Sequence, residues 1–158
     1  MHDTAASGAL GRVPAHLMPP LAVLRAYPAH DYTLAGAFAS RLASRVDKPF
    51  YVYDGRSRTW GEFAGDVAKA AGLLAQRGVK AGDRVGIVAR NHPAHVLLLF
   101  ALARLGATMV PINPEFGVAE AGYVLQHAEL SGVASDAACL ATTRAACAER
   151  GLSPWMVL

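Results

Sequence analysis

The sequence predicts an α/β fold with a mostly parallel sheet and helices on both faces. Short apolar runs alternate with helical periodicity along much of the chain, which is typical of this class. The runs at 84–89 and 108–112 are apolar without alternation, as in strands that are buried on both faces. The apolar stretch between Pro93 and Gly106 has the length of a crossover helix. These three segments predict a βαβ unit within a larger sheet.

Size and charge narrow the possible functions. The 158 residues suit one domain, and 53% of them are hydrophobic while only 17% are charged. We therefore expect part of the apolar surface to contact a partner outside these 158 residues. The net charge is +3, and the basic residues are scattered rather than clustered. This pattern favours neither a nucleic-acid partner nor a membrane surface.

No targeting or membrane segment is expected. Residues 1–30 lack the basic start and apolar core of a signal peptide and are predicted to form a loose leader. The run Val96 to Ala103 is far shorter than the roughly 20 residues that span a bilayer, so it predicts a buried helix and no transmembrane segment. Cys139 and Cys147 lie eight apart without a CxxC pattern. We expect buried structural thiols in a reduced, cytoplasmic chain.

The first elements are a helix and a hairpin. A helix capped by Thr33 and ending near Val46 places three apolar side chains on one face, namely Leu34, Phe38 and Leu42. Residues 50–59 are rich in β-formers around Asp54-Gly55, a strong tight-turn dipeptide, and predict an antiparallel hairpin.

A helix from Thr59 to Arg77 follows directly. Thr59 and Glu62 have the spacing of a capping box, and Gly78 supplies the left-handed conformation that ends the helix. Its apolar face is predicted to consist of Phe63, Val67, Ala70, Ala71 and Leu74. In the βαβ unit, Asn91 is placed to cap the crossover helix, with Pro93 in its first turn.

The last part of the chain continues the alternation. A helix at Val118–His127 should turn Tyr123 and Val124 toward the sheet, and three further segments are predicted to form a strand, a helix and a strand: Gly132 to Ser135, Ala137 to Arg150, and Pro154 to Leu158. We expect the helical residues Leu97 to Leu102 to find partners within the chain. The outer edge of the last strand should be open.

The residues alone point to no chemistry. There is no GxxxxGK phosphate loop, GxGxxG fingerprint, HExxH pair or GxSxG elbow, and Gly82 and Gly86 lie at the entry end of a strand. Polar residues do follow both strands at the edge where open α/β sheets bind ligands: Arg90, Asn91 and His92, then Asn113 and Glu115. Helix capping and turns explain them as well as ligand binding does. His92 and His95 have no metal partner at ligand spacing, and the carboxylates of Glu115, Glu120 and Glu129 are not paired. We assign no catalytic, cofactor-binding or metal-binding residue.

Five motifs in order resemble the opening of the AMP-binding, adenylate-forming superfamily, which includes acyl-CoA synthetases, luciferases and peptide-synthetase adenylation domains. They are Thr59-Trp60-Gly61-Glu62-Phe63, Gly78 to Val85, Asn91, Leu105 to Pro114, and Tyr123 to His127. Trp60 and Phe63 stand where Tyr and Leu are commoner. The resemblance runs from about Asp31 to the end. It implies that 31–158 is the N-terminal portion of an AMP-dependent synthetase/ligase domain, with the fold incomplete at its C-terminus.

Within that superfamily, Asn113 to Gly117 looks more like acyl-CoA ligases than peptide synthetases, whose usual run is Asp-Pro-x-Tyr-Pro. The resemblance implies an acid–thiol ligase for fatty, aryl or carnitine-type acids, using ATP, Mg²⁺ and coenzyme A. The family's phosphate loop, Tyr-Gly-x-Thr-Glu segment, ribose Asp and C-terminal lysine match no position here. We therefore expect no cofactor on this chain alone.

Three hypotheses remain open at this stage. The chain is the N-terminal fragment of an ATP-dependent acyl-CoA ligase, inactive alone and completed by the rest of the ligase domain. Alternatively, it is a non-catalytic α/β binding or regulatory module derived from that family, with an oligomer partner on its open edge. A small Rossmann-type nucleotide-binding protein is a third reading, which the missing glycine fingerprint argues against.

Overall fold

The computed structural model describes residues 31–152 and the strand at 154–157. The predicted leader at residues 1–30 and the end of the last predicted strand, Leu158, lie outside the described residues. The chain divides into two compact units, and all the helices and strands below belong to the second, which begins at Thr33. None of the described helices is long and apolar enough to cross a bilayer.

The described elements alternate as the sequence predicts. In order they are α2 (Leu34–Leu42), β1 (Pro49–Tyr53), β2 (Arg56–Thr59), α3 (Trp60–Gln76), β3 (Arg84–Val88), α4 (Pro93–Leu105), β4 (Thr108–Ile112), α5 (Val118–His127), β5 (Gly132–Ser135), α6 (Leu140–Ala148) and β6 (Pro154–Val157).

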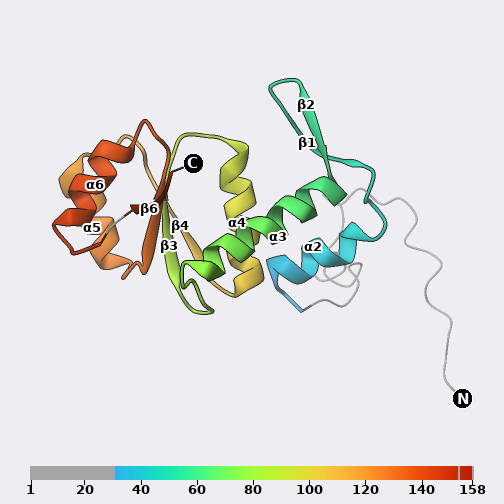
Figure 1. Cartoon of the computed structure of the whole chain (residues 1–158), viewed down its shortest axis with the longest axis horizontal. Helices are drawn as coiled ribbons and strands as arrows, with labels where there is room; N and C mark the ends of the chain where they lie inside the picture. The colour runs from blue at the N-terminus through green and yellow to red at the C-terminus, as the bar shows by residue number, and fades with distance from the viewer. Residues whose placement is uncertain (1–30, 153, 158) are drawn as a thin grey trace, which may run out of the picture. The chain divides into compact units, whose positions relative to one another are not determined.

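A four-stranded sheet in the order β4-β3-β5-β6 forms the centre of this unit, and every pair in it is parallel. Helices α3 and α4 lie on one side of it and α5 and α6 on the other (Figure 1). The predicted α/β class with helices on both faces is confirmed. Among the described strands β6 pairs only with β5, which agrees with the open outer edge expected from the sequence.

Each face of the sheet has its own apolar core. Val85 and Ile87 of β3 pack with α3 and α4, while Val88 packs with α5 and α6. This division follows from the alternation of side chains along a strand. Leu98, Ala101 and Leu102 of α4 belong to the first core, and Val124 packs against the second. The helical segments therefore find the partners within the chain that the sequence predicts.

A cluster of aromatic rings joins α2 and the hairpin to α3 and α4. Phe38 stacks on Trp60 at 5.2 Å, and Phe50 stacks on Phe63 at 4.2 Å between ring centroids. Phe100 of α4 lies 4.9 Å from Phe38 and 5.6 Å from Phe63. Aromatic pairs at such distances each add about 0.5–1.5 kcal/mol beyond area burial. The cluster therefore fixes segments that the sheet itself does not reach.

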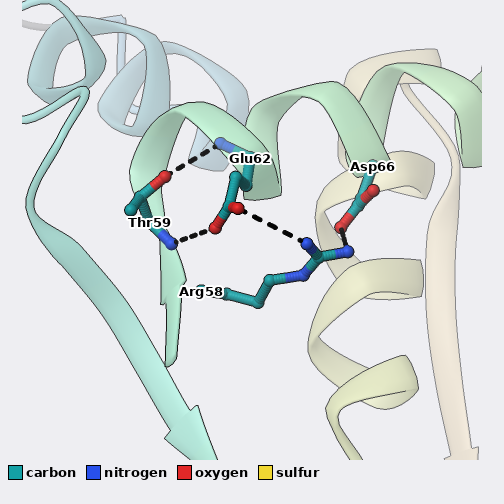
Figure 2. A network of polar contacts seen from close by, with 4 residues as sticks. All are labelled: Arg58, Thr59, Glu62 and Asp66. Atoms are coloured by element: carbon teal, nitrogen blue, oxygen red, sulfur yellow. Dashed lines mark hydrogen bonds and ion pairs between the residues drawn. The ribbon is translucent and has the colours of Figure 1, made fainter. Parts of the chain in front are cut away.

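The hairpin leads into α3 through a capping box, as predicted. Its turn residues Asp54 and Gly55 both have positive φ, 49° and 70°, as a type I′ turn requires. The Thr59 Oγ1 accepts a hydrogen bond from the Glu62 N–H at 3.2 Å, and the Glu62 carboxylate accepts from the Thr59 N–H at 2.9 Å. Figure 2 shows this exchange.

The Arg58 guanidinium extends the same network along α3. It lies 3.7 Å from the Glu62 carboxylate and 2.9 Å from that of Asp66 (Figure 2). The side chain of Arg58 is 43% exposed, so each pair contributes little free energy in water. The network therefore adds little to the stability of the fold.

Two helices are shorter than predicted. Helix α2 ends at Leu42 rather than near Val46, because the Arg45 N–H donates to the Leu42 carbonyl, three residues back, at 3.0 Å, and the chain continues as turns. Helix α6 begins at Leu140 rather than at Ala137. There the Asp136 carboxylate accepts the Cys139 N–H at 2.8 Å and holds the preceding residues in a turn.

Tyr123 is a further correction, because its side chain does not face the sheet. It is 64% exposed and stacks on His127, four residues later, with the ring centroids 5.5 Å apart. Helix α5 instead buries Ala121, Gly122 and Leu125. These small residues and one leucine admit α5 close to α6, so the buried face is rotated away from Tyr123.

The capping box makes a testable prediction. Thr59→Ala should lower the free energy of unfolding by about 1 kcal/mol, because the Glu62 N–H loses its acceptor at the start of α3. Urea denaturation at neutral pH measures the change. Thr59→Ser keeps the hydroxyl and is the matched control. Equal losses in both variants would show that the methyl group, and not the cap, is responsible.

A pair of glycines tests the packing around β3. A Cβ on Gly86 would lie 2.6 Å from the Leu130 Cδ1 and 3.2 Å from the Ile112 Cδ1, both buried. Gly86→Ala should therefore destabilise the fold by about 1–3 kcal/mol through overpacking. Gly65→Ala, in α3 with open space around it, should stabilise by about 0.5–1 kcal/mol. Thermal melts of both variants measure these changes. A Gly86→Ala variant as stable as the native chain would contradict the close contact of Gly86 with Leu130 and Ile112.

Candidate functional site

The topology places one crevice where open α/β sheets bind ligands. Strands β3 and β5 are neighbours, but the chain leaves β3 into α4 on one face and leaves β5 into α6 on the other. Ligands of such sheets bind beyond the carboxyl ends of the strands at this switch point. The residues that follow β3, β4 and β5 are therefore the candidate site.

Asp136 bridges this crevice. Its carboxylate accepts the backbone N–H of Arg90, after β3, at 3.0 Å and that of Cys139, before α6, at 2.8 Å. The Asp136 N–H donates to the Val88 carbonyl at 3.0 Å. The Arg90 N–H lowers the pKa of the Asp136 carboxyl more than burial raises it, and the Cys139 N–H adds to the lowering. The carboxylate therefore stays ionised and ties β3 to α6. Sequence inspection did not single out Asp136, because its role depends on β3 and β5 being neighbours.

The two thiols are structural, as predicted. Cys139 and Cys147 are free and buried. Burial raises the pKa of both thiols, and Asp136 raises that of Cys139 further. A protonated, buried thiol is a poor nucleophile. Cys139 in addition caps α6 instead of lying within it, and its Sγ lies 3.9 Å from the Pro114 carbonyl oxygen.

The polar residues after β3 serve the helix, but not in the predicted way. His92, and not Asn91, caps α4: its Nδ1 accepts the Ala94 N–H at 3.1 Å. Pro93 occupies the first helical position, so the cap falls on the residue immediately before it. The predicted cap at Asn91 is therefore wrong by one residue.

Asn113, which follows β4, and the glutamates Glu120 and Glu129 also form contacts with residues other than a ligand. The Asn113 side-chain oxygen accepts the Glu115 N–H at 3.0 Å, which forms a turn. The Glu120 carboxylate accepts the Gly117 N–H at 2.9 Å at the start of α5, and Glu129 pairs with Arg84 at 2.9 Å. Within the described part of the chain, no group of three or more His, Cys, Asp or Glu side chains could hold a metal ion.

Solved structures share this arrangement. A benzoate CoA ligase from Burkholderia xenovorans matches 80% of this chain with a TM-score of 0.73 at 22% identity, over 26% of its own length. NpsA-ThdA, an artificially fused adenylation–PCP didomain from Klebsiella oxytoca, matches 71% of this chain with a TM-score of 0.64 at 25% identity, over 21% of its length. The fold is thus that of the N-terminal subdomain of adenylate-forming enzymes.

Sequence comparison then gives the family. Residues 38–154 match the family described as AMP-binding enzyme, and the chain belongs to that family. The medium-chain acyl-CoA ligase ACSF2 of Danio rerio is 37% identical over 83 residues, and a feruloyl-CoA synthase of an Amycolatopsis species is 40% identical over 73 residues. These matches cover 52% and 46% of this chain, but only 14% and 15% of the two relatives.

Asp136 supplies the prediction for this site. Asp136→Asn should lower the free energy of unfolding by about 1–2 kcal/mol at pH 7, because one of the two backbone N–H groups loses its acceptor. The folded-state pKa lies below the unfolded value of about 3.9, so the carboxylate's contribution is full above that value. The difference between the native chain and the variant should shrink as the pH falls through the folded-state pKa.

Urea denaturation from pH 7 down to acid conditions measures this difference. Asp47→Asn removes the same charge at an exposed position and should change stability by less than about 0.5 kcal/mol. A loss for Asp136→Asn that stays constant over the whole range would assign the effect to shape instead of charge.

Proposed function

We propose that this chain is the N-terminal part of an ATP-dependent acyl-CoA ligase and is inactive by itself. The observation that carries the proposal is the family match over 38–154, together with two relatives, named as an acyl-CoA ligase and a feruloyl-CoA synthase, of which the chain covers about one seventh. The substrate would be a fatty, aryl or carnitine-type carboxylic acid. The buried, protonated thiols support a reducing, cytoplasmic setting.

The proposed reaction has two steps. A carboxylate oxygen forms a bond to the α-phosphorus of ATP and pyrophosphate leaves, which gives an acyl-adenylate. The thiol of coenzyme A then bonds to the acyl carbon, loses its proton, and AMP leaves, which gives the thioester. Both steps need donors and cations that stabilise charge on a phosphate in transfer.

The described residues do not fit the ATP phosphates or the magnesium ion of that reaction. At the switch point the N–H groups of Arg90 and Cys139 already donate to the Asp136 carboxylate, whose charge would repel a phosphate. The described residues also offer no cluster of three metal-ligating side chains. The chain would therefore provide a scaffold for groups that belong to the rest of the ligase domain.

Acid-dependent exchange of pyrophosphate into ATP tests the proposal. The isolated 158 residues, assayed with fatty, aryl and carnitine-type acids, should give no exchange above the blank, while a complete ligase such as the Burkholderia enzyme is the positive control. Exchange by the isolated chain would contradict its inactivity.

The mass of the polypeptide in its native cells distinguishes the N-terminal part of a ligase from a non-catalytic module. A species several times 16.6 kDa that carries these residues and shows acid-dependent exchange is the expected result. A species near 16.6 kDa without exchange would favour the non-catalytic module, which the single pairing of β6 also suits.

A further inference from the structure

A cleft lies between the hairpin and the start of α4, and its residues Asn91 and His92 directly follow Arg90, whose N–H donates to Asp136 at the crevice. It has a volume of about 270 Å³. Its lining comes from β1 and from the residues around the α4 cap: Phe50, Tyr51, Val52, Tyr53, Asn91, His92, Pro93 and Val96. The aromatic cluster fixes its floor, because Phe50 also stacks on Phe63.

The cleft gathers apolar side chains that are open to solvent. Val52 is 66% exposed, Tyr53 47% and Val96 39%. Singly scattered apolar side chains are normal on a protein surface, but a contiguous group commonly marks a binding site. These three lie on two different elements and line one concave surface. The cleft therefore suits a ligand with an apolar body.

His92 places a fixed hydrogen-bond donor at the cleft. Its Nδ1 must be unprotonated, because it accepts the Ala94 N–H that it caps. In the neutral imidazole the proton is then on Nε2, which becomes the donor. The ring packs edge-on against Tyr53, with the centroids 5.4 Å apart and the planes at 74°. The cap and the tyrosine thus hold both the tautomer and the orientation of His92.

A second concave surface adjoins the cleft and is basic. It shares Tyr51, Tyr53, His92 and Pro93 with the cleft and adds Arg56, Ser57 and Arg58. Arg58 is engaged by Glu62 and Asp66, whereas Arg56 forms no ion pair with a described residue. Neither surface has an aspartate or glutamate in its lining. The carboxylates of Glu62 and Asp66 are paired with Arg58, so the donors left for an anionic group at the shared rim are His92 and Arg56.

We propose that the cleft binds a small amphipathic carboxylate. Its ring or short chain fills the apolar cavity, and its carboxylate lies at the rim, where the His92 Nε2–H and the Arg56 guanidinium donate to it. The volume is near the roughly 300 Å³ lower end for ligand pockets, which favours a single ring over a long chain. The site is independent of the proposed ligase activity, because binding here requires neither ATP nor the rest of a ligase domain.

Titration of the isotope-labelled 158-residue chain with benzoate, followed by amide NMR without nucleotide, tests the site. Benzoate at millimolar concentration should shift the amide signals of Val52, Tyr53, His92 and Val96 in a saturable way. Benzyl alcohol, which lacks the charge, should bind more weakly at the same residues. Shifts that are absent from these residues, or equal for the two probes, would overturn the proposal.

A charge-matched pair of variants tests the rim. Arg56→Gln should weaken benzoate binding by about two- to fivefold, as expected for an exposed ion pair, and leave benzyl alcohol binding unchanged. Lys69→Gln removes the same charge from an exposed position on α3 that does not line the cleft, and should change neither. Equal weakening by both variants would mean that overall charge attracts benzoate and that no rim site exists.

A third variant tests the apolar cavity. Val96→Glu should abolish binding of both probes, and retained binding would place the ligand elsewhere.

Discussion

The rest of the structure depends on the burial of β3. This strand is paired on both edges, to β4 and β5, and from Val85 onward every residue of it is buried. Its side chains supply both cores, and Gly86 leaves room for Leu130 and Ile112 where a side chain would collide. A strand with no exposed face requires helices on both sides of the sheet. That requirement explains why α4 and α6 cover opposite faces, and hence why a switch point exists between β3 and β5.

Local chemistry explains how much the sequence could predict. The capping box at Thr59, the Asp54-Gly55 turn and the left-handed Gly78 act within a few residues, and the structure keeps each of them. The order of the strands could not be predicted in the same way, because no motif within or beside β5 indicates that it pairs with β3 instead of β4. Asp136 therefore remained unnoticed: its partner Arg90 is 46 residues away in sequence. The error at Asn91 had a local cause, since Pro93 already fixed the cap at His92.

The aromatic cluster is a second feature that depends on contacts between residues distant in sequence, and it could not be predicted from local patterns. Phe38, Phe50, Trp60, Phe63 and Phe100 come from four elements, and the sequence gives each of them only an apolar position. Once packed, they hold the hairpin against α3 and α4. This contact forms the hairpin side of the cleft, so the candidate binding surface could not be predicted before the packing was known. Its donor, His92, has no metal partner at ligand spacing in the sequence, and helix capping explains it there as well as ligand binding does.

The two concave regions differ in what their polar groups still have to offer. At the switch point the backbone donors are already satisfied by Asp136, and an ionised carboxylate occupies the place where an anion would bind. At the cleft the cap uses one nitrogen of His92, and this fixes the proton on the other. Hydrogen bonds that complete the fold therefore close the first region and orient a donor in the second. A site that relies on a helix cap in this way needs no separate element to position it, because the contact that starts α4 also orients its donor.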